Sequence, residues 1–244
     1  MKKEISRRDF CKGMAAGAVG IAAAGFLGGC APTSTEGVAT LTTDEAMNYD
    51  GKYDVIVVGA GGAGLAAAYE ALAAGCSTLV LEHENNHLKS NTALCGGVVM
   101  AAESSIQQAA GVQDSKANFR KYLEAVGGGF EDPAMMDVWA EESGSTLDWL
   151  IDLGVNFPVD KLYMSGNEPG YEDVAPAVPR GCITAENSGS SICEVLYNKV
   201  VEKGGEVKFK TTAQRLITNK TGRVVGVITD QGTYRANKGV ILCT

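Results

Sequence analysis

The chain has few of the residues that mark several common kinds of protein. Its seven cysteines form no C-x-x-C pair and no C-x-x-C-H haem-attachment site, which excludes a readable zinc cluster, disulfide framework or covalent haem. Positive charge is also scarce. The net charge of −8 and the isoelectric point near 4.9 argue against a nucleic acid as partner. There is no internal repeat, and no low-complexity tract beyond the N-terminal Ala/Gly stretch. Any electron transfer would therefore need a redox group that these cysteines do not hold.

The N-terminus of the chain is predicted to be an export signal. Residues 1–30 would therefore not be part of the fold. Residues 6–12 read S-R-R-D-F-C-K and resemble the twin-arginine export motif. A weakly apolar run at 14–27 follows, which is too short to span a bilayer comfortably. We therefore expect export by the twin-arginine route.

The end of this signal resembles a bacterial lipoprotein box. Residues 27–30 read L-G-G-C, which would make Cys30 the lipidated residue, and a plain cleavage site is the alternative. Residues 31–50 are polar and predict a flexible tether. The expected location is thus the outer face of the cytoplasmic membrane or the periplasm, with a lipid anchor at Cys30.

The rest of the chain, with 45% apolar residues overall, is long enough to bury a core, and one glycine-rich stretch organises it. Tyr53–Val58 is a short, mostly β-branched run that predicts a buried parallel strand. It leads directly into glycines spaced G-x-G-x-x-G and then into an Ala-rich helix at 65–72. This order predicts a tight turn at Gly59, close approach of a pyrophosphate to Gly61 and close helix–strand packing at Gly64.

An acidic residue stands where such a motif needs one. A second strand, Ser77–Leu81, ends at Glu82, 18 residues beyond Gly64, which suits a carboxylate that accepts hydrogen bonds from a ribose. Phosphates would lie on the helix N-terminus, with the backbone of Ala60 and Gly62 beside them. The chain therefore predicts a dinucleotide site, and the alternative is an ordinary glycine-rich turn with a strand-end carboxylate.

Both histidines lie in the polar loop that follows. His83 and His87 are four residues apart, but nothing in the loop has helical periodicity and no acid motif accompanies them, so no metal site is predicted. We expect His83 near the adenosine end of the dinucleotide and His87 on the surface.

Residues 91–97 read N-T-A-L-C-G-G, in which small residues let the backbone approach a flat ring. Together with the glycine motif and Glu82, this segment resembles the fumarate reductase/succinate dehydrogenase flavoprotein family, which includes soluble fumarate and urocanate reductases and 3-oxosteroid 1-dehydrogenases. The resemblance implies FAD as cofactor. It also implies that the segment contacts the pyrophosphate and isoalloxazine through Asn91, Thr92, Cys95, Gly96 and Gly97.

The chain departs from the family pattern in two places. Lys89-Ser90 stands where a Gly pair is usual, and Cys95 stands where Ser is usual. Cys95 is either a redox thiol or a small stand-in beside the flavin, and the stand-in is favoured because no second cysteine or base lies near it in sequence.

Two single residues and several elements are predicted further along the chain. Arg180 is expected to be a solvated charge or a phosphate contact. Near the C-terminus the pattern T-x-A-x-x-L is a family hallmark, and the resemblance implies that the backbone of Ala213 meets the adenine. The expected elements are a helix at 116–126 capped by Asp114, a helix from Asp132 to Gly154, a long loop at 156–181, a helix at 192–203, a strand at 206–209, a hairpin at 211–229 and a strand at 238–244.

The predicted fold class is α/β. Residues 51–244 would form a Rossmann-like FAD-binding domain with a central parallel sheet and an added β-hairpin. The resemblance covers only the first part of the family's usual length, so we expect the capping domain to be absent and the sheet to be incomplete at its C-terminal end.

In the family, the catalytic groups come from beyond the position of Thr244, so no catalytic residue is assigned. Three readings stay open: an exported reductase of fumarate, urocanate or another enoate, fed by a membrane or cytochrome donor; the 3-oxosteroid dehydrogenase branch; and a non-catalytic flavin-binding fragment. Each of the first two acts on a small-molecule substrate.

Overall fold

The computed structural model describes residues 42–43, 47–164 and 177–244. The predicted export signal and the lipidation site at Cys30 lie outside the described residues, as do most of the tether at 31–50 and part of the loop at 156–181. Leu41–Thr244 forms one folding unit.

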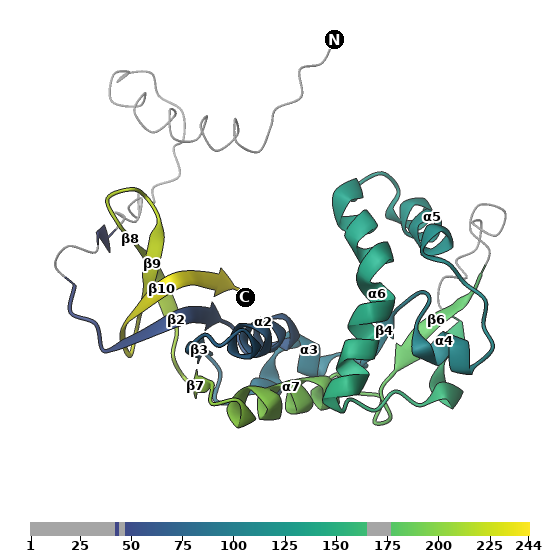
Figure 1. The fold of residues 1–244 in the computed structure, drawn as a ribbon, viewed down its shortest axis with the longest axis horizontal. Coiled ribbons are helices and arrows are strands. Elements are labelled where there is room, and N and C mark those ends of the chain that lie inside the picture. The colour runs from purple at the N-terminus through teal and green to yellow at the C-terminus, as the bar shows by residue number, and fades with distance from the viewer. Residues whose placement is uncertain (1–41, 44–46, 165–176) are drawn as a thin grey trace, which may run out of the picture. The chain divides into compact units, whose positions relative to one another are not determined.

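Seven strands make the main sheet: β1 (Thr42–Thr43), β2 (Gly51–Val58), β3 (Thr78–Leu81), β7 (Glu206–Lys208), β8 (Ala213–Thr218), β9 (Val224–Thr229) and β10 (Gly232–Leu242). Their order is β1-β8-β9-β10-β2-β3-β7 (Figure 1). β10, β2, β3 and β7 pair in parallel, whereas β8 and β9 form an antiparallel hairpin that continues into β10. The predicted parallel sheet with an added hairpin is therefore confirmed.

A second, smaller sheet was not predicted. It consists of β4 (Val98–Met100), β5 (Tyr163–Met164) and β6 (Pro179–Ile183), in the antiparallel order β4-β6-β5. Its strands are only two to five residues long and come from distant parts of the chain, so no local alternation in the sequence announces them.

The helices include the predicted ones and several short additions: α2 (Gly62–Ala73), α3 (Asn91–Leu94), α4 (Ser105–Ala109), α5 (Lys116–Gly127), α6 (Pro133–Leu153) and α7 (Ser190–Glu202), with the 3₁₀ turns η2 (His87–Lys89) and η3 (Val159–Lys161). α6 begins after its cap Asp132 and ends at Gly154, which adopts a left-handed φ of 112°. The predicted cap of α5 is wrong, because Ser115 and not Asp114 accepts the backbone N–H of Asn118, at 3.1 Å. No described helix is long and apolar enough to cross a membrane.

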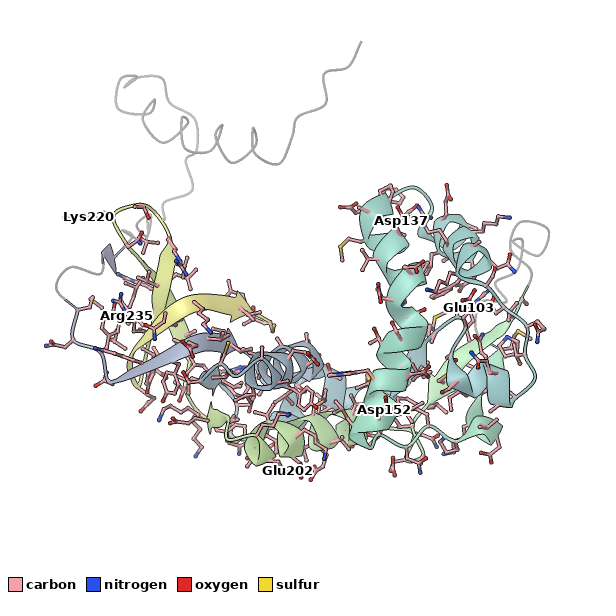
Figure 2. The ribbon with its side chains drawn as sticks, in the orientation of Figure 1. Glu103, Asp137, Asp152, Glu202, Lys220 and Arg235 are labelled. Carbon is pink, nitrogen blue, oxygen red and sulfur yellow. The ribbon has the colours of Figure 1, made fainter. Side chains whose placement is uncertain are left out.

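The core lies on both faces of the parallel strands. Val57 and Val80 pack with Leu65 of α2 and Leu196 of α7 on one face, and α2 and α7 contact each other there. The alternate positions of β2 and β3 join a second cluster on the opposite face, together with residues of β9 and β10. A strand buried on both faces reads as a continuous apolar run, which is why β2 was recognisable from sequence. Charged residues such as Asp152 and Glu202 are exposed to solvent (Figure 2).

Candidate functional site

The glycine motif forms a tight connection between β2 and α2. Gly59 has a φ of 105°, and a Cβ there would lie 2.4 Å from the backbone O of Cys243 on β10's extension. A Cβ at Gly64 would lie 1.9 Å from the backbone O of Gly59. At Gly61, by contrast, such a Cβ would make ordinary contacts, with the Cβ of Ser90 at 3.4 Å and Oγ1 of Thr92 at 3.9 Å, so the protein itself does not exclude a side chain there. The glycines at 59 and 64 are thus required by the protein's own packing, whereas the packing does not require the glycine at 61.

Glu82 follows β3 and is tied to this turn. Its side chain is only 6% exposed. Oε2 accepts the backbone N–H of Ala60 at 2.7 Å, and Oε1 accepts the backbone N–H of Glu84 at 2.8 Å. Nδ1 of His83 lies 3.0 Å from the same Oε1. A carboxylate has about four lone-pair sites, so Glu82 keeps capacity for a ribose hydroxyl while it fixes the loop.

A cavity of about 440 Å³ opens at this edge. It lies where β2 and β3 end, the edge of an open α/β sheet at which ligands bind. The cavity brings together seven of the predicted site residues: Gly59, Gly61, Gly62, Glu82, His83, Asn91 and Thr92. It adds six that the sequence did not assign: Ala63, Glu84, Lys89, Ser90, Cys243 and Thr244. The last two follow from the predicted C-terminal strand, which ends beside Gly59.

Ala213 lies at a neighbouring hollow of about 120 Å³. Gly59 and His83 line both this hollow and the larger cavity, so the two adjoin. Thr211 and Thr212 complete the wall near Ala213. That Ala213 meets the adenine stays a prediction, and its position beside Gly59 is compatible with it.

The Asn91 segment begins with a short helix, α3, which the sequence analysis did not predict. Ser90 caps α3 by accepting the backbone N–H of Ala93 at 3.3 Å. Oγ1 of Thr92 accepts the backbone N–H of Gly62 at 3.2 Å, which joins this helix to the start of α2. α2 has no acidic residue in its first turn and no side-chain cap from Gly61, so its partial positive charge faces the cavity.

The rest of this segment lies outside the two cavities. Cys95 is exposed, and its Sγ accepts the backbone N–H of Gly97 at 3.4 Å. Gly97 has a φ of 71°, and a Cβ there would meet the backbone of Ser188 at 2.6 Å. Gly96 has no atom within 4 Å of an added Cβ. The structure therefore explains Gly97 by packing and leaves Gly96 without a packing role.

His87 is largely covered by other side chains, so its predicted surface position is wrong. Its side chain is 11% exposed and stacks on Tyr197 of α7, with ring centroids 4.0 Å apart and planes at 8°. Phe209 packs at 6.4 Å from the imidazole, and Nε2 lies 3.6 Å from Oε2 of Glu194. Burial lowers the pKa of His87, against a smaller opposing effect of Glu194. The ring anchors the loop after Glu82 to α7.

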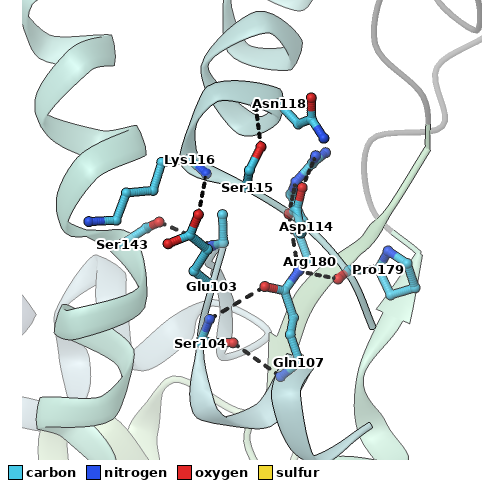
Figure 3. A network of polar contacts seen from close by, with 11 residues as sticks. Glu103, Ser104, Gln107, Asp114, Ser115, Lys116, Asn118, Ser143, Pro179 and Arg180 are labelled. Atoms are coloured by element: carbon cyan, nitrogen blue, oxygen red, sulfur yellow. Dashed lines mark hydrogen bonds and ion pairs between the residues drawn. The ribbon is translucent and has the colours of Figure 1, made fainter. Parts of the chain in front are cut away.

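The prediction for Arg180 is also wrong. Its side chain is fully buried on β6 and forms a bidentate pair with Asp114, at 2.7 Å from Nε to Oδ2 and 2.8 Å from Nη2 to Oδ1 (Figure 3). The guanidinium lies 5.3 Å from the ring centroid of Phe119, and Gln107 donates to Asp114 at 3.2 Å. Arg180 therefore holds the small sheet to the segment before α5, away from the cavity.

Across the described ranges, no three His, Cys, Asp or Glu residues are grouped so that they could hold a metal ion. The two histidines serve other contacts: His83 lies by Glu82, and His87 stacks on Tyr197.

The chain is similar to several characterised proteins along most of its length. It is 29% identical to digoxin reductase of Eggerthella lenta over 266 aligned residues, covering 99% of this chain and 46% of that protein. It is 27% identical to the acrylate reductase flavoprotein subunit of Shewanella woodyi, covering 100% of this chain and 46% of that protein. It is 31% identical to urocanate reductase of Eggerthella lenta, covering 80% of this chain and 29% of that protein. The chain thus spans about half the length, or less, of these relatives.

Solved structures give the same result. A 3-ketosteroid-Δ4-(5α)-dehydrogenase from Rhodococcus jostii superposes with a TM-score of 0.77 at 29% identity, covering 83% of this chain and 47% of that one. The open conformation of a flavocytochrome c3 fumarate reductase superposes with a TM-score of 0.70 at 25% identity, covering 80% of this chain and 34% of that one. Residues 54–244 match the family described as FAD binding domain. The chain therefore belongs to this FAD-binding family, and its cofactor is FAD.

Proposed function

We propose that the protein carrying this chain is an exported FAD-dependent reductase of an activated C=C bond, such as that of fumarate, urocanate or another enoate. One observation carries the proposal. The glycine turn, the anchored carboxylate of Glu82 and the helix start at Gly62 converge on a single cavity, in a chain similar to reductases of such substrates.

The residues around the cavity fit the adenine dinucleotide half of FAD. Gly61 lines the cavity without a side chain, which suits the close approach of a pyrophosphate, and the N-terminus of α2 favours negative charge there. Glu82 would hold the ribose, and Ala213 would face the adenine. Asn91 and Thr92 would continue the phosphate contacts, with Cys95, Gly96 and Gly97 beyond them towards the flavin ring. Bound FAD supplies the redox chemistry, by exchanging a hydride with the substrate.

The role of this chain is to bind and orient the cofactor. Glu82 keeps the turn in place through the backbone of Ala60, and Thr92 keeps the start of α2 against α3. The groups that hold the substrate and move its proton belong, in this proposal, to a part of the protein beyond these residues.

We further propose delivery by the twin-arginine route and lipidation at Cys30. A protein placed on the outer face of the cytoplasmic membrane would take electrons from a membrane or cytochrome donor. The likeness to a flavocytochrome fumarate reductase supports a donor of this kind.

The 3-oxosteroid dehydrogenase branch is the second candidate. A specific observation favours it, because the structure with a TM-score of 0.77 is a 3-ketosteroid dehydrogenase. In that case the same cofactor site would serve the oxidation of a steroid ring.

One experiment separates the two candidates. The full-length protein is purified and assayed with a reduced viologen dye against fumarate, urocanate and acrylate, and with an oxidising dye against a 3-oxosteroid. Reduction of one enoate supports the first candidate, and steroid oxidation supports the second. Gly61→Ala is the matched variant, since its Cβ has room in the protein but fills the space assigned to the pyrophosphate. A protein that stays colourless with excess FAD would overturn the proposal.

A further inference from the structure

The cavity has an unusual charge balance for a site that receives a pyrophosphate. Its lining includes two carboxylates, Glu82 and Glu84, and Lys89 is the only lysine or arginine among the described residues that line it. The pyrophosphate of FAD is itself a dianion. Without Lys89, two negative charges on the cofactor would meet two on the protein, with only the partial charge of the α2 start to offset them.

Lys89 is available for a new partner. Its Nζ lies 3.1 Å from Oε2 of Glu84, and the two side chains are 50% and 35% exposed. Ion pairs at this exposure are weak, because water competes for both groups. Glu82 is different, since both of its oxygens already accept backbone N–H groups and hold it in place.

Lys89 also lines the same cavity as Gly61. It immediately precedes Ser90, the residue whose Cβ is the nearest atom to a Cβ built on Gly61. Ser90 is fixed as the cap of α3, and His87 anchors the other end of η2 against Tyr197. The backbone on both sides of Lys89 is therefore held, while its long side chain is free to change partner within the cavity.

We propose that Lys89 leaves Glu84 when the cofactor binds and donates to the pyrophosphate of FAD. Lys89 stands at one of the two positions where the family pattern usually has glycine, so this contact would be particular to chains with a lysine there. The inference rests on the cofactor placement in the proposed function. An ammonium–phosphate contact is a charge-assisted hydrogen bond, stronger than the exposed pair that it replaces.

The test is a titration of the cofactor-free, full-length protein with FAD at low and at high salt. The quenching of flavin fluorescence measures the binding. Lys89→Met should weaken FAD binding about 10- to 100-fold at low salt and flatten its salt dependence. Lys89→Arg should stay within about threefold of the natural protein, because it keeps the charge. Glu84→Gln should tighten binding about two- to tenfold, since it removes both a competing acceptor and a like charge.

Lys199→Met is the matched control, because Lys199 forms a similar exposed pair with Glu202 on α7, and it should leave FAD affinity unchanged. The sign of the Glu84→Gln effect on FAD affinity decides between two roles of Lys89: a phosphate ligand, or a residue that only orders the loop. If Lys89 only orders the loop through Glu84, both Lys89→Met and Glu84→Gln weaken FAD binding, and the proposal is wrong. Equal affinity in Lys89→Met and the natural protein also overturns it. A natural protein that binds no FAD overturns the cofactor placement itself.

Discussion

The backbone N–H of Ala60 donates a 2.7 Å hydrogen bond to Oε2 of Glu82, so the acid after the second strand holds the glycine turn after the first. The other oxygen accepts from the backbone of Glu84. Glu82→Gln would replace one acceptor by an NH₂ group that faces a backbone donor. We expect this variant to lose about 1–3 kcal/mol in free energy of unfolding and to bind FAD about 10- to 100-fold more weakly.

Denaturant unfolding and FAD titration measure the two effects. Glu186→Gln is the control, because Glu186 is exposed and lies far from this turn in the chain, and it should change neither quantity. Unchanged stability in Glu82→Gln would show that the two backbone contacts do not support the turn.

The glycines of the site divide into two groups with opposite expectations. Gly64→Ala places a Cβ 1.9 Å from a backbone oxygen, so it should destabilise the cofactor-free protein by about 1–3 kcal/mol. Gly96→Ala meets no atom within 4 Å and should leave the cofactor-free stability unchanged, but weaken FAD binding if the flavin ring lies against Gly96. Gly239→Ala, which also meets nothing within 4 Å, is the control. Equal FAD affinity in Gly96→Ala and Gly239→Ala would remove Gly96 from the predicted site.

The sequence predicted those parts of the fold whose cause is local. The G-x-G-x-x-G turn directly follows the strand β2, and Glu82 stands at the offset that a dinucleotide site requires. The residues that begin and end α6 are single residues with known preferences for these positions. The cofactor cavity was predictable in outline for the same reason, because strands that end together bring their following loops together.

The errors concern residues whose environment comes from distant segments. Asp114 was predicted as a helix cap because a helix follows it. Ser115 is one residue closer to the start of α5 and caps it, while the carboxylate of Asp114 accepts hydrogen bonds from Arg180 on β6. His87 stands in a polar loop, yet Tyr197 and Phe209 arrive from α7 and the region after β7 to cover it. No local pattern around either residue announces a partner that lies 66 or more positions away.

His87 should make stability depend on pH. Burial lowers its pKa below the unfolded value of 6.5, so below pH 6.5 the unfolded chain takes up a proton that the folded chain does not. The contribution of His87 is therefore fully present above pH 6.5 and is lost as the pH falls towards the lowered folded pKa. The facing groups are Glu194 and Tyr197 on α7 and Phe209 after β7, and of these Glu194 opposes the shift.

His87→Phe keeps an aromatic ring on Tyr197 but does not titrate. Thermal midpoints measured from pH 7.5 to pH 5 should fall less in His87→Phe than in the natural protein, with the difference appearing below pH 6.5. Parallel curves for the two proteins would mean that His87 titrates alike in the folded and unfolded chains.

Arg180 and Asp114 should each be needed for stability as long as the other is present, although neither is part of the cofactor site. Removing one partner leaves the other charge buried without a counter-ion, so Arg180→Met and Asp114→Leu should each cost about 3–5 kcal/mol. The double variant should recover most of this loss, because it leaves no buried charge. Arg120→Met, which breaks an ion pair of Arg120 with the exposed Asp137, should cost far less, because water screens an exposed pair. FAD titration under native conditions separates a packing role of Arg180 from phosphate binding. The double variant should bind FAD like the natural protein. Weaker binding in the double variant than in the natural protein would mean that Arg180 contacts the cofactor.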